Sequence, residues 1–161
     1  PSVVCGNEDN FTNLFAKLSL SPIIPVVRPD YKFQPILADD VATAIVKAIE
    51  IKKNEGKIYE IGGPTIISFK DMVKSIVNTI GKKRFIVEMP MPLAKVQAAL
   101  FSLMPRPLLT KDQCEILNEA DNVVSNNHLT LKDLNIEPTD VQKAMTKWLW
   151  RYRAGGEFAK I

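Results

Sequence analysis

The stretch KFQPILADDVATAIVKAIE, residues 32–50, changes within a short span from an extended segment to a helix. Pro35 limits KFQPIL to an edge strand or a turn entry, because proline has no amide hydrogen for a sheet ladder. Asp39 and Asp40 follow, and we interpret them as helix caps rather than as a paired-carboxylate site. The apolar residues after them recur at helical spacing and predict one core-facing side. That side comprises Val41, Ala44, Ile45, Ala48 and Ile49.

The same alternation of strand and helix extends toward both ends of the chain. An apolar run over residues 1–5 precedes a helix predicted over residues 9–20, which Pro22 and Pro25 end. These elements place a strand and a helix ahead of the central stretch.

Further along the chain, strands are predicted over residues 57–63 and 84–90. The helix between them begins at a capping box formed by Ser68 and Asp71 and ends near Gly81. Alternating strands and helices predict an α/β fold with parallel strand pairing.

The region after Pro90 has helical patterns and no strand signal. A nearly all-apolar helix is expected over residues 92–104, and we favour its burial over an open docking patch. Further helices are expected to begin at Thr110, Thr130 and Thr139, each of which opens a capping pattern. This helical region is expected to cover one side of the sheet.

Composition and charge exclude several classes of protein. The net charge of +3 over 161 residues is mild and spread out, unlike the dense basic patches of nucleic-acid binders. Cys5 and Cys114 lie far apart without a CxxC motif, which favours reduced, buried thiols over a zinc site. His128 stands alone in a polar stretch and is expected at the surface. No apolar run reaches the ~18 residues that a membrane-spanning helix needs, so any membrane contact is expected to be peripheral.

Three stretches together resemble one family. PSVVCGNED (1–9) resembles the strand that follows the catalytic Tyr-x-x-x-Lys of extended and atypical short-chain dehydrogenases, within the NAD-dependent epimerase/dehydratase superfamily. FQPILADDVATAI (33–45) resembles a later segment of that family. PLLTKDQCEILNEADNVVS (107–125) resembles a narrower group, which contains the NAD(P)-binding accessory subunit of NADH-ubiquinone oxidoreductase (respiratory complex I) and its bacterial relatives.

The resemblance implies a division of the chain. Residues 1–62 would be the last strands and helices of a Rossmann-like NAD(P)-binding domain with a doubly wound parallel sheet. Residues 63–161 would be a smaller, mainly helical lid or substrate region. The resemblance also implies that Pro1, Ser2 and Val3 lie beside the nicotinamide end of NAD or NADP. The alternative is that these residues form a buried strand with no role in ligand binding.

By the same resemblance, this chain would be a C-terminal part whose upstream half holds a glycine-rich phosphate loop and the Tyr-x-x-x-Lys pair. Neither motif occurs in these 161 residues. The chain by itself is therefore expected to turn over no substrate and to hold the cofactor weakly or not at all.

Two positions depart from the nucleotide-sugar members of the family. Val3 stands where those members usually carry asparagine, and Tyr31 stands where they usually carry the arginine that grips a diphosphate. A nucleotide-sugar epimerase is therefore disfavoured. The favoured role is an accessory subunit that stabilises or assembles a respiratory complex with nucleotide bound. The alternatives are a reductase, epimerase or dehydratase acting on a small or isoprenoid-like substrate, and a partner- or membrane-binding module without nucleotide.

The last predicted helix carries a core-facing stripe and an indole outside it. Trp150 lies off the stripe, among basic residues, and either anchors a partner or membrane surface or is covered by Phe158 of the tail. The expected partners are the missing nucleotide-binding half, respiratory subunits or a membrane surface. The expected location is the cytoplasm, the inner face of the respiratory membrane, or the mitochondrial matrix in a eukaryote. The stripe comprises Val141, Met145, Trp148, Leu149 and Tyr152.

Overall fold

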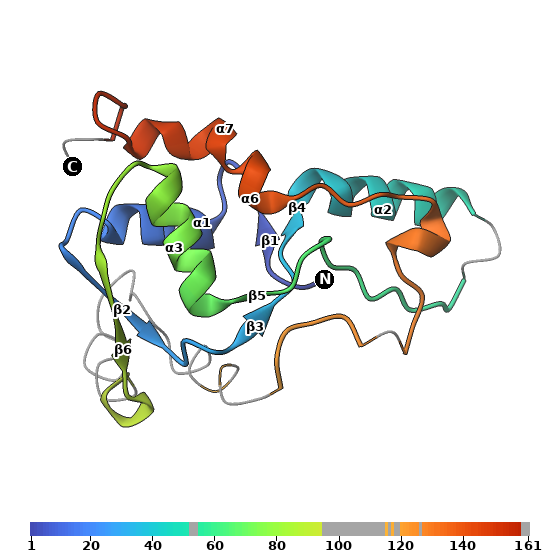
Figure 1. The fold of residues 1–161 in the computed structure, drawn as a ribbon. Helices are drawn as coiled ribbons and strands as arrows, with labels where there is room; N and C mark the ends of the chain where they lie inside the picture. Colours follow the sequence, from blue (N-terminus) through green and yellow to red (C-terminus); the bar gives the residue numbers. More distant parts are fainter. Residues whose placement is uncertain (52–54, 95–114, 116, 118–119, 126, 159–161) are drawn as a thin grey trace, which may run out of the picture.

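The protein has an α/β arrangement in which short strands alternate with helices (Figure 1). The computed structural model describes residues 1–161 except 52–54, 95–114, 116, 118–119, 126 and 159–161. The elements in chain order are β1 (Val4–Cys5), α1 (Asn10–Leu18), β2 (Ile23–Val27), β3 (Lys32–Phe33), β4 (Ile36–Leu37), α2 (Ala38–Glu50), β5 (Ile67–Ser68), α3 (Phe69–Thr79), β6 (Phe85–Met89), η2 (Leu131–Leu134), α6 (Val141–Ala144), α7 (Thr146–Leu149) and η3 (Trp150–Tyr152).

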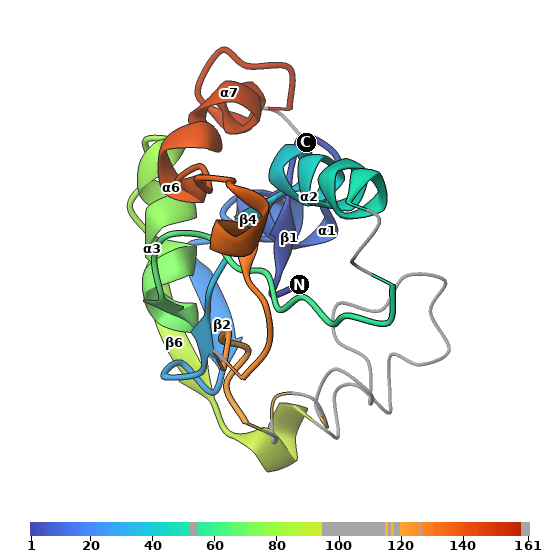
Figure 2. The same ribbon diagram turned by 90° about the vertical axis from the view of Figure 1, so that its right-hand side faces the viewer.

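Strand pairing is mostly parallel, as the alternation of elements predicts. β1 pairs with β4, and β2 pairs with β6 over five residues, both in parallel. β3 and β5 form a short antiparallel pair. The predicted α/β class with parallel pairing is confirmed. Figure 2 shows β1 and β4 side by side at the start of α2.

Strand β2 was not predicted, because its Pro25 indicated only the end of the preceding helix. Pro25 instead pairs with Val87 within the parallel ladder of β2 and β6. Among the described residues β2 pairs with β6 alone, and a strand with an open edge accepts proline.

The strand predicted over residues 57–63 is too long, because only one residue of this segment forms a bridge to a neighbouring segment. Tyr59 makes an isolated parallel bridge to Leu129, where the amide of Glu60 donates to the Leu129 carbonyl at 2.8 Å. The ladder ends there because Gly63 turns toward another segment, and its amide donates to the Gln34 carbonyl at 3.1 Å. The opening run is likewise shorter than expected, since β1 has two residues.

Helix α2 corrects two predictions. Its N-cap is Leu37, which makes no side-chain cap, so Asp39 and Asp40 lie inside the first turn rather than at the cap. There they complement the helix dipole, and Asp40 also accepts a hydrogen bond from the Thr139 amide at 2.7 Å. The predicted core face is only partly buried: Val41, Ala44 and Ala48 pack against the smaller core, whereas Ile45 and Ile49 are exposed.

The other predicted helix starts are mixed in outcome. Ser68 caps α3 by accepting from the Asp71 amide, and Thr130 forms a full capping box with Asp133. At the last helix the cap is Asp140 rather than Thr139, because the Asp140 carboxylate accepts from the Gln142 amide. The Thr110 start and nearly all of the helix predicted over 92–104 lie outside the described residues.

The C-terminal helix predicted as one element is divided into α6, α7 and η3. The division falls at Met145, whose carbonyl accepts from the Trp148 amide at 3.3 Å and from the Leu149 amide at 2.9 Å, a shared bond of the kind common at helix ends. The predicted stripe is nevertheless buried in full. No helix in the described part of the chain is long and apolar enough to cross a membrane.

Two clusters of buried side chains hold these elements together. The larger one joins α1, β2, α3 and the C-terminal helices, and Figure 1 shows α7 lying over α1 and α3. It contains aromatic side chains from both halves of the chain, such as Phe33 and Phe69, whose ring centroids are 5.4 Å apart. The division at residue 62 remains a prediction. The smaller cluster lies under α2 and comprises Ile36, Ala44, Ile61, Leu131, Leu134 and Ile136.

Candidate functional site

The segment predicted to face the nicotinamide is tied into the fold through Ser2. The buried Ser2 hydroxyl donates to the Asn122 carbonyl at 2.8 Å and accepts from the Gln34 amide at 3.0 Å. The Ser2 amide donates to the Ile61 carbonyl at 3.0 Å. Ser2 therefore joins three segments that are distant in sequence, and its hydroxyl is already engaged within the protein.

Gln34 completes this junction. Its Nε2 donates to the Gly63 carbonyl at 2.8 Å, and its Oε1 accepts from the Val124 amide at 3.1 Å. Sequence reasoning missed both Gln34 and Asn122, because no local pattern relates residues so far apart along the chain. We call Ser2, Gln34 and Asn122 the N-terminal junction.

Residues 1–3 can make apolar contacts with a nucleotide but few polar contacts. None of the side chains of Pro1, Ser2 and Val3 carries a charge that could grip a diphosphate. The Val3 carbonyl accepts from the Ile36 amide at 3.0 Å. Pro1, which is exposed, and Val3, which is half-buried, could pack against a ring. These residues fit a contact at the edge of a nucleotide site whose main part lies elsewhere.

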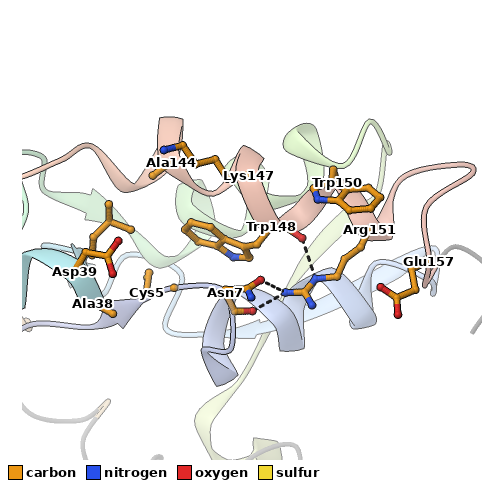
Figure 3. A pocket seen from close by; sticks show the side chains of 12 residues that line it. Cys5, Asn7, Ala38, Asp39, Ala144, Lys147, Trp148, Trp150, Arg151 and Glu157 are labelled. Carbon is orange, nitrogen blue, oxygen red and sulfur yellow. Dashed lines mark hydrogen bonds between the residues drawn. The ribbon is translucent and has the colours of Figure 1, made fainter. Parts of the chain in front are cut away.

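An open groove of about 580 Å³ lies where β1 and β4 end (Figure 3). The carboxyl ends of parallel strands are where open α/β sheets bind ligands. One wall follows these strands, and the other comes from the C-terminal helices. The lining residues are Cys5, Gly6, Asn7, Leu37, Ala38, Asp39, Ala144, Lys147, Trp148, Trp150, Arg151 and Glu157.

Charges of both signs line this groove. The Arg151 guanidinium donates to the backbone and side-chain oxygens of Asn7, and its Nε donates to the Trp148 carbonyl at 3.0 Å (Figure 3). These hydrogen bonds of Arg151 connect η3 to the turn after β1. Lys147 and Asp39 stand on opposite walls and form no ion pair within the described part of the chain.

Cys5, at the edge of the groove, is a packed thiol. Its side chain is fully buried, and burial, helped by the nearby Asp9 carboxylate, raises the pKa of the thiol to about 12. A thiol with such a pKa stays protonated at neutral pH and is a poor nucleophile. The prediction of reduced, buried thiols is confirmed for the burial of Cys5, and Cys114 lies outside the described residues.

Trp150 is exposed, as its position off the stripe predicts, with 54% of its surface accessible. The C-terminal tail folds back, but it covers other residues. The amide of Phe158 donates to the Arg151 carbonyl at 2.8 Å, and the Phe158 ring lies 5.3 Å from that of Tyr152. The alternative in which Phe158 covers Trp150 is therefore wrong.

Tyr31, which replaces the family's arginine, is a core residue. Its ring is buried, its hydroxyl donates to the Ala120 carbonyl at 3.2 Å, and the Arg28 guanidinium lies 5.1 Å from its ring centroid. His128 is exposed, with Nε2 3.9 Å from a Glu60 carboxylate oxygen, and this agrees with the surface position predicted for it.

Comparison with curated proteins finds relatives along the whole chain. "NADH dehydrogenase [ubiquinone] 1 alpha subcomplex subunit 9, mitochondrial" of Dictyostelium discoideum is 30% identical over 165 residues, which cover 100% of this chain and 46% of that protein. The Arabidopsis thaliana protein of the same name is 31% identical over 170 residues, which cover 97% of this chain and 42% of that protein. The chain thus spans less than half the length of these relatives. A scan against models of protein families finds no match.

Comparison with solved structures supports the fold. The crystal structure of gox2253 is similar with a TM-score of 0.60 and 19% sequence identity, over 92% of this chain and 47% of that one. At this level of identity the similarity bears on the fold alone.

Proposed function

On the premise that this chain is a relative of the mitochondrial NADH dehydrogenase subunits over its whole length, we propose that it is part of an NAD(P)-binding accessory subunit of respiratory complex I. The observation that carries this proposal is sequence similarity that runs through every described element rather than through one motif. The proposed protein is similar to short-chain dehydrogenases and has a stabilising or assembly role, with its nucleotide bound and not turned over.

In this proposal the chain closes the nicotinamide end of the nucleotide site. NAD or NADP would be held mainly by a nucleotide-binding half, which corresponds to the part of the relatives that this chain does not span. Pro1 and Val3 would add apolar contact at the ring. The N-terminal junction supports this role, because Ser2, Gln34 and Asn122 fix the position of that segment. Residues 1–62 would belong to the nucleotide-binding domain and residues 63–161 to the lid.

The proposed partners are the nucleotide-binding half and subunits of the respiratory complex. The proposed location is the mitochondrial matrix or the inner face of a respiratory membrane, because the relatives are named as mitochondrial. Exposed Trp150, beside Lys147 in the groove, favours a second candidate, a partner-binding module that works without nucleotide.

Isolation of the protein from its own cells tests the proposal. A tag at the C-terminus allows gentle purification, after which bound small molecules are released by denaturation in cold organic solvent near neutral pH and identified by mass spectrometry. We expect NAD(H) or NADP(H) together with subunits of NADH dehydrogenase. Nucleotide without respiratory subunits, accompanied by turnover of small carbonyl substrates, would favour the enzyme alternative. A stable product with neither nucleotide nor respiratory subunits would contradict the proposal and favour the module.

A further inference from the structure

Five basic residues gather where the ends of α1, α3 and η3 meet (Figure 1). Arg84 Nε donates to the Ser19 carbonyl at the end of α1, at 2.6 Å. Arg153 Nε donates to the Thr79 carbonyl at the end of α3, at 2.7 Å. These bonds bring the link between α3 and β6 to the same place as the ends of α1 and η3. We call the five residues the basic cluster: Lys17, Lys82, Lys83, Arg84 and Arg153.

The positive charge of the basic cluster is mostly uncompensated. Each helix C-terminus carries about half a negative charge, so the ends of α1 and α3 offset about one of the five positive charges. None of the five side chains forms an ion pair within the described part of the chain. Burial, and then the neighbouring Arg84 guanidinium, lower the pKa of the Lys82 ammonium, as expected where positive charges crowd together. An excess of about four positive charges therefore remains.

The three segments that build this side of the protein contain no acidic residue. These segments are residues 10–29, 72–87 and 141–156. Asp9, Asp71 and Asp140 flank them, but each stands at the beginning of its helix, whereas the basic cluster lies at the helix ends.

The other flanking acidic residues also lie apart from the cluster. Asp30 follows β2 at the end opposite Ile23. Glu88 lies on the other side of β6 from Phe85, by the alternation of a strand, and Glu157 lines the groove of Figure 3. Residues 95–119 carry three basic and three acidic side chains, so this largely undescribed stretch adds no net charge. This side of the protein is therefore suited to an anionic partner.

An apolar sheet face adjoins the basic cluster. Phe85 directly follows the cluster, stands opposite Ile23 in the register of β2 and β6, and donates its amide to the Pro22 carbonyl at 3.0 Å. Phe85 is 76% exposed and Ile23 53%. On the same side of the strands, exposed Val87 stands opposite exposed Pro25. Contiguous exposed apolar side chains mark an interaction surface. We call Ile23, Pro25, Phe85 and Val87 the β2–β6 face.

The kinds of residue favour a membrane over a protein partner. Three of the five cations are lysines, which are depleted in protein interfaces relative to the rest of a protein surface. Clusters of lysine and arginine beside exposed apolar side chains are instead typical of proteins that bind anionic lipids. A bilayer presents phosphate groups next to apolar chains, which matches a basic cluster next to an apolar face.

We propose that the basic cluster and the β2–β6 face together bind a bilayer that contains anionic phospholipids. The basic side chains lie at the phosphate groups, and Phe85 and Ile23 enter the interfacial region. This inference rests on the proposed function, which locates the protein beside a respiratory membrane. It assigns the contact to this surface and not to Trp150, which lines the groove.

Sedimentation with lipid vesicles tests the proposal. The full polypeptide that contains this chain is purified without other subunits. It is mixed with vesicles of phosphatidylcholine alone, or of phosphatidylcholine and phosphatidylglycerol in equal amounts. We expect binding to the mixed vesicles to be at least about tenfold stronger. High salt is expected to weaken that binding by a similar factor, because it screens the attraction between exposed charges.

Two matched pairs of substitutions locate the contact. Ile23→Glu is expected to weaken binding to the mixed vesicles at least about tenfold, because a carboxylate replaces an apolar contact beside anionic lipid. Its control, Ile66→Glu, changes an isoleucine that is equally exposed at 53% and is expected to leave binding unchanged. Lys83→Glu is expected to weaken binding at least about fivefold. Its control, Lys70→Glu, lies at the other end of α3 and is expected to have no effect.

Urea unfolding of each variant shows whether it folds. Lys83→Glu keeps the test decisive if Ile23→Glu does not fold, because Lys83 is exposed. Equal effects within either pair of folded variants would overturn the proposal. So would equal binding to the two kinds of vesicle, no binding, or a loss of binding with Trp150→Ser alone.

The result is independent of the nucleotide measurement. Vesicle binding through this surface by a protein that holds no nucleotide and no respiratory subunits would support the membrane contact and contradict the proposed function. Nucleotide and respiratory subunits without vesicle binding would do the reverse.

Discussion

Substitution of Thr12 by valine tests how the C-terminal helices are fastened to the rest of the fold. Thr12 is fully buried in α1, where its hydroxyl donates to the Asp9 carboxylate and accepts from Trp148 Nε1 at 3.0 Å. Valine keeps the shape of threonine and removes the hydroxyl. Asp9 then loses one donor, and the indole N–H loses its acceptor in a buried position.

The magnitude follows from these two losses. A buried donor left without a partner costs about 1–3 kcal/mol, and a hydrogen bond to a charged group contributes about 1.5–3 kcal/mol. The Asp9 carboxylate still accepts hydrogen bonds from the amides of Thr12 and Gly6. The cost of losing its bond from the Thr12 hydroxyl therefore falls at the low end of the range for charged groups. We expect Thr12→Val to lower the free energy of unfolding by about 2–4 kcal/mol.

A double-mutant cycle isolates the bond to Trp148. In a Trp148→Phe background the indole donor is absent, so Thr12→Val is expected to cost less than in the wild-type background, by at least about 1 kcal/mol. Urea unfolding followed by far-ultraviolet circular dichroism measures all four proteins, because this signal reports mainly the backbone and, unlike fluorescence, does not require Trp148. Equal costs in both backgrounds, or a cost below about 0.5 kcal/mol, would refute the reasoning.

Two further predictions concern a glycine and a thiol. Gly63→Ala is expected to destabilise the fold by at least about 2 kcal/mol in urea unfolding, because a Cβ there would lie 1.9 Å from the Pro35 carbonyl oxygen. Gly6→Ala is the control, since its nearest neighbour would be at an ordinary 3.4 Å, and equal losses would contradict the argument. Burial raises the pKa of the Cys5 thiol from 9.0 to about 12, so the folded state keeps a proton that the unfolded chain releases. Stability from this thiol is therefore complete below pH 9.0 and is lost as the pH rises toward about 12. In a Cys114→Ser variant at pH 8, an aromatic disulfide reagent should react with Cys5 only after unfolding, and rapid reaction of the folded protein would contradict its burial.

Elements with local signals could be predicted from the sequence. Ser68 and Thr130 cap helices where the pattern predicts caps, since a cap involves residues only a few positions apart. Strand β6 was also found, because its β-branched and aromatic residues stand between polar turns. The α/β class follows from the order of such elements.

Contacts between distant residues could not be predicted. Ser2 bonds Gln34 and Asn122, across 32 and 120 positions. Both partners lie in stretches that carry the family resemblance, but no local pattern indicates which side chains bond to one another. The pairing of β2 with β6 outweighs the usual effect of Pro25. Such contacts depend on the packing of the whole chain, which propensity and spacing do not encode.

Helix α2 shows a different limit of sequence reasoning. Apolar residues lie on two adjacent sides, so periodicity could not distinguish the packed side around Ala44 from the exposed side with Ile49. Val46 was not assigned to a face at all, and it lies on the exposed side with 55% of its surface accessible.

Fractionation of native membranes and soluble extract from the protein's own cells tests the central claim most directly. Gently solubilised complexes are separated by size on native gels, and every slice is analysed by mass spectrometry. The account predicts that peptides of this chain peak in the same slices as subunits of NADH dehydrogenase. Peptides confined to slices without those subunits would contradict a role in the respiratory complex.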